Sequence, residues 1–115
     1  MTGEASINLF SYGTLQLDSV QLSSFGRLLE GADDAMPGWR KDWLEITDPD
    51  VLKTSGERFH PVVSPSANAA DAVAGKVFRI TPAELEAADR YEVADYKRIE
   101  VALQSGITAW VYVKA

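Results

Sequence analysis

The segment INLFSYGTL, residues 7–15, decides the fold of this chain. Most positions from Ile7 to Tyr12 are apolar or aromatic, which predicts a first strand buried on both faces. Gly13 follows directly, and glycine permits a tight turn where a strand ends. We therefore expect the chain to enter through a buried strand and to turn sharply at Gly13.

Two short helices are expected beyond this turn. Asp18, with Gln21 three residues later, resembles a capping box, and Gly26 suits the end of the first helix. The sequence TPAE at 81–84 combines a capping threonine, a proline suited to the first helical position and a glutamate that completes a second capping box. The second helix is predicted from Pro82 to about Tyr91.

The rest of the chain reads mostly as strand. Further strands are expected at 39–46, 60–63, 73–80, 98–104 and 108–113, and loops at 48–56 and 65–71. Gly75 marks a bulge or a close backbone approach, and the turn at Ser105 and Gly106 predicts a terminal hairpin. Three tryptophans are expected in the core: Trp39, Trp43 and Trp110. This mixture indicates an α+β fold, with a small, mixed, strongly curved or barrel-like β-sheet and two or more short helices.

Composition limits the classes of function. A length of 115 residues fits one domain, 1–115, and a net charge of −6 argues against nucleic-acid or membrane-surface partners. The absence of cysteine excludes disulfides and thiolate chemistry and fits a cytoplasmic protein. No apolar stretch approaches the roughly 20 residues that span a bilayer, and no signal segment is visible.

Glu92 is the strongest candidate for a catalytic residue. Leu85, Ala88 and Glu92 lie at helical spacing and share one face, so an apolar environment should surround the carboxylate. Desolvation raises the pKa of a carboxyl group and suits it to act as a general base near neutral pH. The alternative is that Glu92 pairs with Arg90 or Arg98 and is only structural.

The turn at Gly13 is a candidate anion cradle. Glycine exposes consecutive backbone N–H groups, which bind carboxylates or a developing oxyanion, although an ordinary turn is the alternative. His60 is the single histidine, so a histidine-rich metal site is not expected. A hydrolase built on Ser11 and His60 is disfavoured because Ser11 lacks a nucleophile-elbow sequence. His60 could line a substrate cavity or be a packed loop residue.

Several motifs resemble the gamma-glutamylcyclotransferase-like family, in particular its gamma-glutamylamine cyclotransferase-like branch. They are YGTL at 12–15, DRYE at 89–92, YKR at 96–98, GKVF at 75–78 and AWVYV at 109–113. Their order and spacing make the combination more specific than any one motif. The resemblance spans nearly the whole chain.

The resemblance implies a small mixed barrel and a cyclotransferase reaction on a small gamma-glutamyl substrate. The α-amine of the gamma-glutamyl group attacks its own γ-carbonyl, forming 5-oxoproline and releasing an amine or amino acid. Glu92 would move the proton, and no cofactor or metal would be needed. The residues expected to bind substrate are Tyr12, Gly13, Thr14, Leu15, Tyr96 and His60. A binding or interaction domain without enzymatic activity on the same fold is the alternative.

Overall fold

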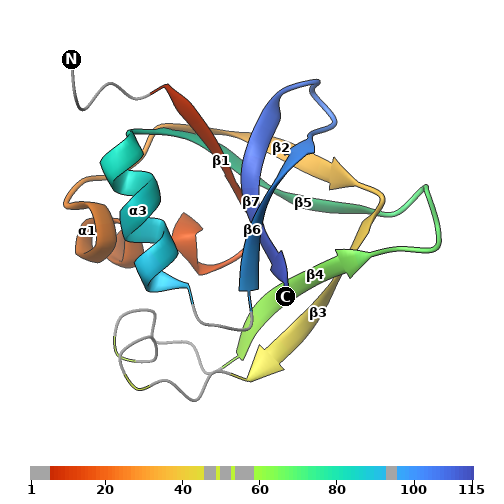
Figure 1. Cartoon of the computed structure of the whole chain (residues 1–115), viewed down its shortest axis with the longest axis horizontal. Helices are drawn as coiled ribbons and strands as arrows, with labels where there is room; N and C mark the ends of the chain where they lie inside the picture. The colour runs from red at the N-terminus through yellow and green to blue at the C-terminus, as the bar shows by residue number, and fades with distance from the viewer. Residues whose placement is uncertain (1–5, 46–48, 50–52, 54–58, 93–95) are drawn as a thin grey trace.

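The computed structural model describes residues 6–45, 49, 53, 59–92 and 96–115, without the side chains of residues 44, 59 and 60 (Figure 1). A five-stranded sheet has the order β2-β5-β1-β7-β6, and β3 and β4 form a second, two-stranded sheet. The elements are β1 (Ile7–Ser11), the 3-10 helix η1 (Thr14–Gln16), α1 (Asp18–Phe25), β2 (Gly31–Pro37), β3 (Trp39–Glu45), β4 (Phe59–Pro65), β5 (Ala72–Ile80), α3 (Pro82–Tyr91), β6 (Tyr96–Ala102) and β7 (Thr108–Lys114).

The larger sheet is mixed and curled. Strand β1 runs antiparallel to β5 and parallel to β7, and β6 and β7 form the predicted terminal hairpin. Helices α1 and α3 lie together on one side of the molecule, while the β3–β4 pair crosses near the lower ends of β6 and β7 (Figure 1). This arrangement confirms the α+β prediction.

Strand β1 separates two hydrophobic clusters, because successive side chains of a strand point to opposite faces. Leu9 is fully buried in a cluster that also contains Phe78 and residues of both helices. Phe10 is 1% exposed and belongs to the other cluster, with Met36 and Val63 from the strands. The prediction that the first strand is buried on both faces is therefore confirmed.

The two helices begin differently. Thr81 and Glu84 form the predicted capping box of α3, each side chain accepting a hydrogen bond from the backbone N–H of the other. The capping box predicted for α1 is wrong, because the N-cap residue is Leu17 and Asp18 is already helical. Gln21 instead lies buried and donates to the carbonyl oxygen of Leu15. Both predicted helices nevertheless form.

Strand β2 is the element that the sequence did not predict. Strand β2 lies at the edge of the sheet and, within the described part of the chain, pairs with β5 alone, and its first residues are exposed. An exposed edge strand does not need alternating apolar residues, and the exposed stretch at Asp33 and Asp34 has no such alternation.

The predictions for Gly75 and for the three tryptophans had different outcomes. A Cβ atom on Gly75 would clash with the carbonyl oxygen of Ser11, which confirms the predicted close approach of the backbone. Trp39 and Trp110 are partly buried against the two clusters. Trp43 was wrongly predicted to lie in the core: it is 66% exposed on β3. The predicted loop at 48–56 falls almost entirely outside the described residues.

Candidate active site

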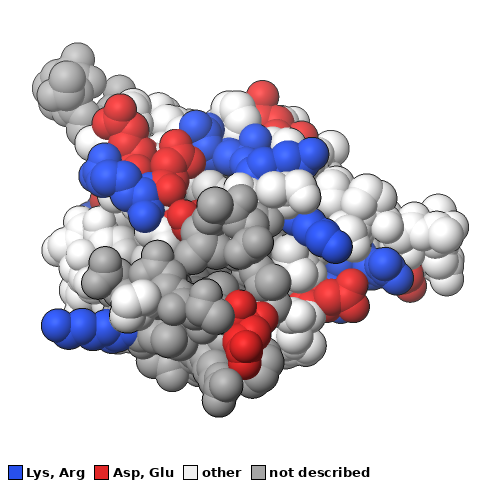
Figure 2. Space-filling view, turned by 60° about the horizontal axis from the view of Figure 1, so that its bottom comes forward, with Lys and Arg blue, Asp and Glu red and all other residues white. Residues whose placement is uncertain are grey.

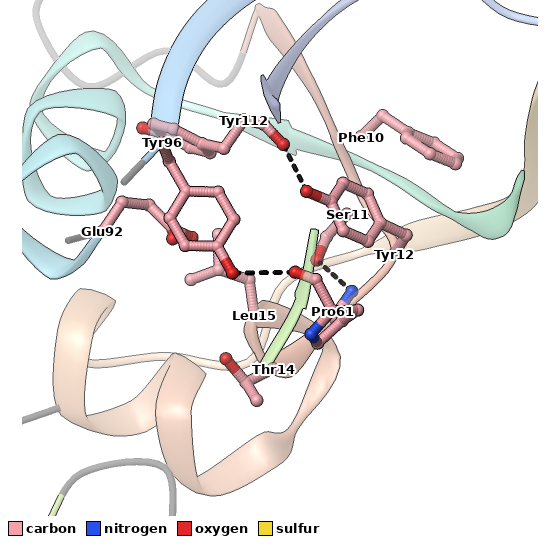
Figure 3. A pocket seen from close by; sticks show the side chains of 10 residues that line it. Phe10, Ser11, Tyr12, Thr14, Leu15, Pro61, Glu92, Tyr96 and Tyr112 are labelled. Carbon is pink, nitrogen blue, oxygen red and sulfur yellow. Dashed lines mark hydrogen bonds between the residues drawn. The ribbon is translucent and has the colours of Figure 1, made fainter. Parts of the chain in front are cut away.

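One pocket gathers most of the residues that the sequence analysis selected (Figure 3). It lies where the end of β1, the η1 turn, β4, the end of α3, β6 and β7 meet. The lining residues are Phe10, Ser11, Tyr12, Gly13, Thr14, Leu15, Pro61, Glu92, Tyr96 and Tyr112. Residues 12–15 and Glu92 are far apart in the sequence, and the fold brings them to the same pocket.

Glu92 enters this pocket from the end of α3. It is the C-cap residue, with extended backbone angles, and its N–H still donates to the carbonyl oxygen of Ala88. Ala88 is fully buried and Leu85 packs against the same cluster. The apolar face of α3 therefore continues into Glu92, whose carboxylate points toward the pocket (Figure 3).

The electrostatic environment of Glu92 is set by burial. Burial raises the pKa of the Glu92 carboxyl from 4.5 to about 8, because the charged form loses its hydration. The alternative pairing with Arg98 is wrong, since Arg98 donates to both carboxylate oxygens of Asp89, at 2.8 and 3.1 Å. Among the described residues, no cation forms an ion pair with Glu92.

The turn after β1 forms the wall facing Glu92. Gly13 has φ −136°, which lies outside the left-handed region that favours glycine. Space is the constraint instead: a Cβ atom on Gly13 would lie 3.0 Å from Cγ of Pro61. Thr14 then opens the 3-10 helix η1, whose first N–H groups have no acceptor inside the helix.

Tyrosine hydroxyls tie the walls of the pocket together. Tyr12 donates to the carbonyl oxygen of Tyr112, and Tyr96 donates to that of Pro61 at 2.8 Å, joining β6 to β4 (Figure 3). The hydroxyl of Tyr112 lies 2.6 Å from Asp89 Oδ1. Burial raises the pKa of Tyr12 and of Tyr112, so both stay protonated at neutral pH.

Some lining residues were not selected from the sequence. Ser11 lies in the pocket and its Oγ accepts a 3.3 Å hydrogen bond from the Gly13 N–H. Tyr112 comes from β7, which pairs with β1, and Pro61 comes from β4 of the second sheet. No local pattern in the sequence reveals either position. His60 lies in β4, but its side chain is outside the described part of the structure, so its predicted place in the cavity stays a prediction.

The space beside Glu92 continues toward a second depression. The cavity itself has a volume of about 20 Å³, which accommodates about one water molecule. A groove of about 210 Å³ shares four wall residues with it: Tyr12, Gly13, Thr14 and Pro61. Leu17, Lys41 and Trp43 complete the groove, which we call the outer groove.

The described residues include no cluster of three or more side chains that could bind a metal ion. None of the helices within the described ranges is long and apolar enough to cross a membrane. On the face shown in Figure 2, Lys and Arg side chains are interspersed with Asp and Glu side chains.

Known proteins that resemble this chain indicate its family. Residues 9–115 match the model of the family described as gamma-glutamyl cyclotransferase, AIG2-like, and the chain belongs to this family. No curated protein matches the chain.

Solved structures share the fold. A protein of Arabidopsis thaliana known from a solution structure is 21% identical with a TM-score of 0.72, over 99% of this chain and 65% of its own. A second Arabidopsis thaliana solution structure is 24% identical with a TM-score of 0.72, over 96% and 70%. A structure named gamma-glutamyl cyclotransferase is 19% identical with a TM-score of 0.71, over 95% and 66%. The chain thus spans about two thirds of the length of these proteins.

Proposed function

We propose that the protein is a gamma-glutamylcyclotransferase that converts a gamma-glutamyl amide into 5-oxoproline and a free amine or amino acid. The observation that supports this most directly is the meeting of Glu92 with the turn 12–15 in one pocket. The family of the chain supports the same class of reaction. The proposal needs one proton-transfer group and one site for an oxyanion, and the pocket offers a candidate for each.

Glu92 is the proposed general base and acid. A carboxyl group with a pKa of about 8 is mostly protonated in the free protein at neutral pH. When the α-ammonium group of the substrate approaches, the opposite charge favours the carboxylate. Glu92 then takes a proton from the ammonium, which frees the amine to attack the γ-carbonyl carbon of the same molecule.

Ring closure produces a tetrahedral intermediate with a negatively charged oxygen. The N–H groups at the start of η1, on Thr14 and Leu15, are candidates to donate to this oxygen, because they have no acceptor inside the helix. Protonated Glu92 returns the proton to the leaving nitrogen, and the C–N bond breaks. The ring nitrogen still carries two hydrogens at this point, and the Glu92 carboxylate takes one of them and passes it to the released amine. The products are 5-oxoproline and the amine as its ammonium ion, and Glu92 is again a carboxylate.

The pocket must open before substrate enters, since about 20 Å³ is far below the size of typical ligand cavities, roughly 300 Å³ and more. The hydrogen bond from Tyr96 to Pro61 closes one side of it. Tyr96 is therefore proposed to contact substrate after this bond breaks. Tyr12 would act differently, as a buried wall whose hydroxyl is already committed to Tyr112.

The direct test is release of 5-oxoproline from a panel of gamma-glutamyl amino acids and gamma-glutamyl amines. The wild-type protein should release it from at least one compound, and the Glu92→Gln variant should bind that compound without converting it. Binding without any release by the wild-type protein would favour the alternative of a non-enzymatic binding domain on the same fold.

A further inference from the structure

The outer groove lies next to the pocket and has its own chemistry. It shares Tyr12, Gly13, Thr14 and Pro61 with the pocket, but Glu92 does not line it. A substrate whose reacting carbonyl sits near Glu92 would extend its other half along these shared residues. The groove is therefore placed where the part of the substrate beyond the scissile bond would lie.

The apolar part of the outer groove is made by exposed side chains. Trp43 is 66% exposed and Leu17 is 39% exposed, and both line it together with Pro61. The exposed ring of a tryptophan on a strand surface is unfavourably hydrated unless another group covers it, and its flat face can pack against another ring. Trp43, which the sequence placed in the core, is thus available at the surface to pack against a ring in the groove.

The polar part of the outer groove is one cation. Lys41 is the single charged side chain among the described residues that line it, and its Nζ lies 5.7 Å from the centre of the Trp43 ring. The chain as a whole carries a charge of −6, so the positive charge of Lys41 beside the pocket differs in sign from the net charge of the protein. Lys41 and Trp43 are two residues apart on β3 and so share a face of the strand.

From this arrangement we infer that the outer groove binds the leaving group, and that the preferred leaving group is an aromatic amino acid with a free carboxylate. Its ring packs on Trp43 and Leu17, and its carboxylate pairs with Lys41. The inference rests on the proposed function for the identity of the other half of the substrate. A leaving amine without a carboxylate leaves Lys41 without its anionic partner and binds more weakly.

Two compounds isolate the carboxylate: gamma-glutamylphenylalanine and the gamma-glutamyl amide of 2-phenylethylamine. They share the gamma-glutamyl group and the aromatic ring, and only the first has a carboxylate on the leaving group. Dissociation constants are measured by calorimetry at low salt in the Glu92→Gln background, and kcat/KM for 5-oxoproline release is measured with Glu92 present. We expect the first compound to be preferred by roughly threefold to fivefold, the scale of an exposed ion pair.

Lys41→Gln should remove this preference, whereas the matched control Arg40→Gln should keep it. Arg40 lies on the same strand, is exposed and is not among the residues that line the groove. Arg40→Gln therefore removes the same charge from the opposite face of β3. The wild-type protein should prefer gamma-glutamylphenylalanine over gamma-glutamylalanine by about tenfold, and Trp43→Ala should lower this preference. Trp43→Phe should restore part of it.

The outcomes separate the two proposals. Equal binding of both compounds, an equal loss for both in Lys41→Gln, or no binding of either would overturn the leaving-group site. An equal loss would mean that Lys41 contacts the carboxylate of the gamma-glutamyl half instead. If the preference depends on Lys41 but no 5-oxoproline forms, the leaving-group site stands and the proposed reaction fails.

Discussion

Two glutamates at opposite ends of helix α3, Glu84 in its first turn and Glu92 as its C-cap residue, have opposite environments. Glu84, near its start, is 12% exposed and accepts hydrogen bonds from Arg27 at 2.7 and 2.8 Å. The Arg27 guanidinium holds the pKa of Glu84 below its ordinary value. Glu92, at the other end, has no cation partner among the described residues, and burial raises the pKa of its carboxyl to about 8.

The contrast separates a carboxylate that stabilises the fold from one that is available for chemistry. Glu84 completes the capping box and pairs with a cation, so its charged form is the stable one. The charged form of Glu92 is destabilised, and nothing in the described structure offsets this. A buried carboxyl group with a strongly raised pKa that lines a pocket is typical of a functional site.

The largest expected effect is on turnover. Glu92→Gln keeps the shape of the side chain but cannot accept a proton, so kcat should fall roughly 100-fold or more. Glu84→Gln is the matched control, and its kcat should stay within about twofold because Glu84 does not line the pocket. Steady-state assays of 5-oxoproline release measure both. Similar losses in the two variants would remove the distinction between them.

The second effect is on the pH dependence of stability, to which Glu92 and Glu84 contribute with opposite signs. Glu92 has a raised pKa in the folded state, so the folded protein holds a proton that the unfolded chain releases above about pH 4.5. The contribution of Glu92 to the stability of the wild-type protein therefore falls as pH rises from about 5 to about 8. Glu92→Gln should remove this fall and be the more stable protein at pH 8, by on the order of 4 kcal/mol.

Glu84 should behave in the reverse way. Its pKa is lowered, so its contribution is present above the unfolded pKa and is lost as the solution becomes more acidic. Glu84→Gln should cost roughly 1–2 kcal/mol near pH 7, because the charge-assisted pairing with Arg27 is lost, and less at low pH. Urea denaturation of both variants at several pH values gives the signs, and parallel curves would contradict the account.

A third and smaller effect concerns the turn opposite Glu92. A methyl group on Gly13 must displace Pro61 by a few tenths of an ångström and narrows the pocket. Since the added Cβ atom meets only side-chain atoms of Pro61, Gly13→Ala should change the melting temperature little while weakening ligand binding about tenfold, about 1.4 kcal/mol. Calorimetry and thermal denaturation measure the two quantities, and unchanged affinity would remove the turn from the binding site.

The sequence predicted the parts of the site that depend on local rules. The capping residues at 81–84 set the start of α3, and helical spacing then placed Glu92 on the buried face beyond its end. Glycine at position 13 located the turn, although for space rather than for backbone angle. Family resemblance connected these two motifs before their proximity was visible.

What the sequence did not predict depends on how the strands are arranged. Tyr112 reaches the pocket because β7 lies parallel to β1, and Pro61 reaches it because β4 packs across the end of β6. Trp43 was misplaced because an aromatic residue in a strand is usually buried, and only the structure shows that its face of β3 borders the outer groove. Long-range neighbours of this kind have no local signal.

The pKa values of Glu92 and Glu84, measured by carbon NMR of the side-chain carboxyl groups in the ligand-free protein, test the central claim most directly. The account predicts that Glu92 titrates near pH 8 and that Glu84 titrates below its ordinary value of 4.5 in the same sample. A Glu92 pKa at or below 4.5 would mean that its carboxylate is solvated or paired, and would contradict its assignment as the general base.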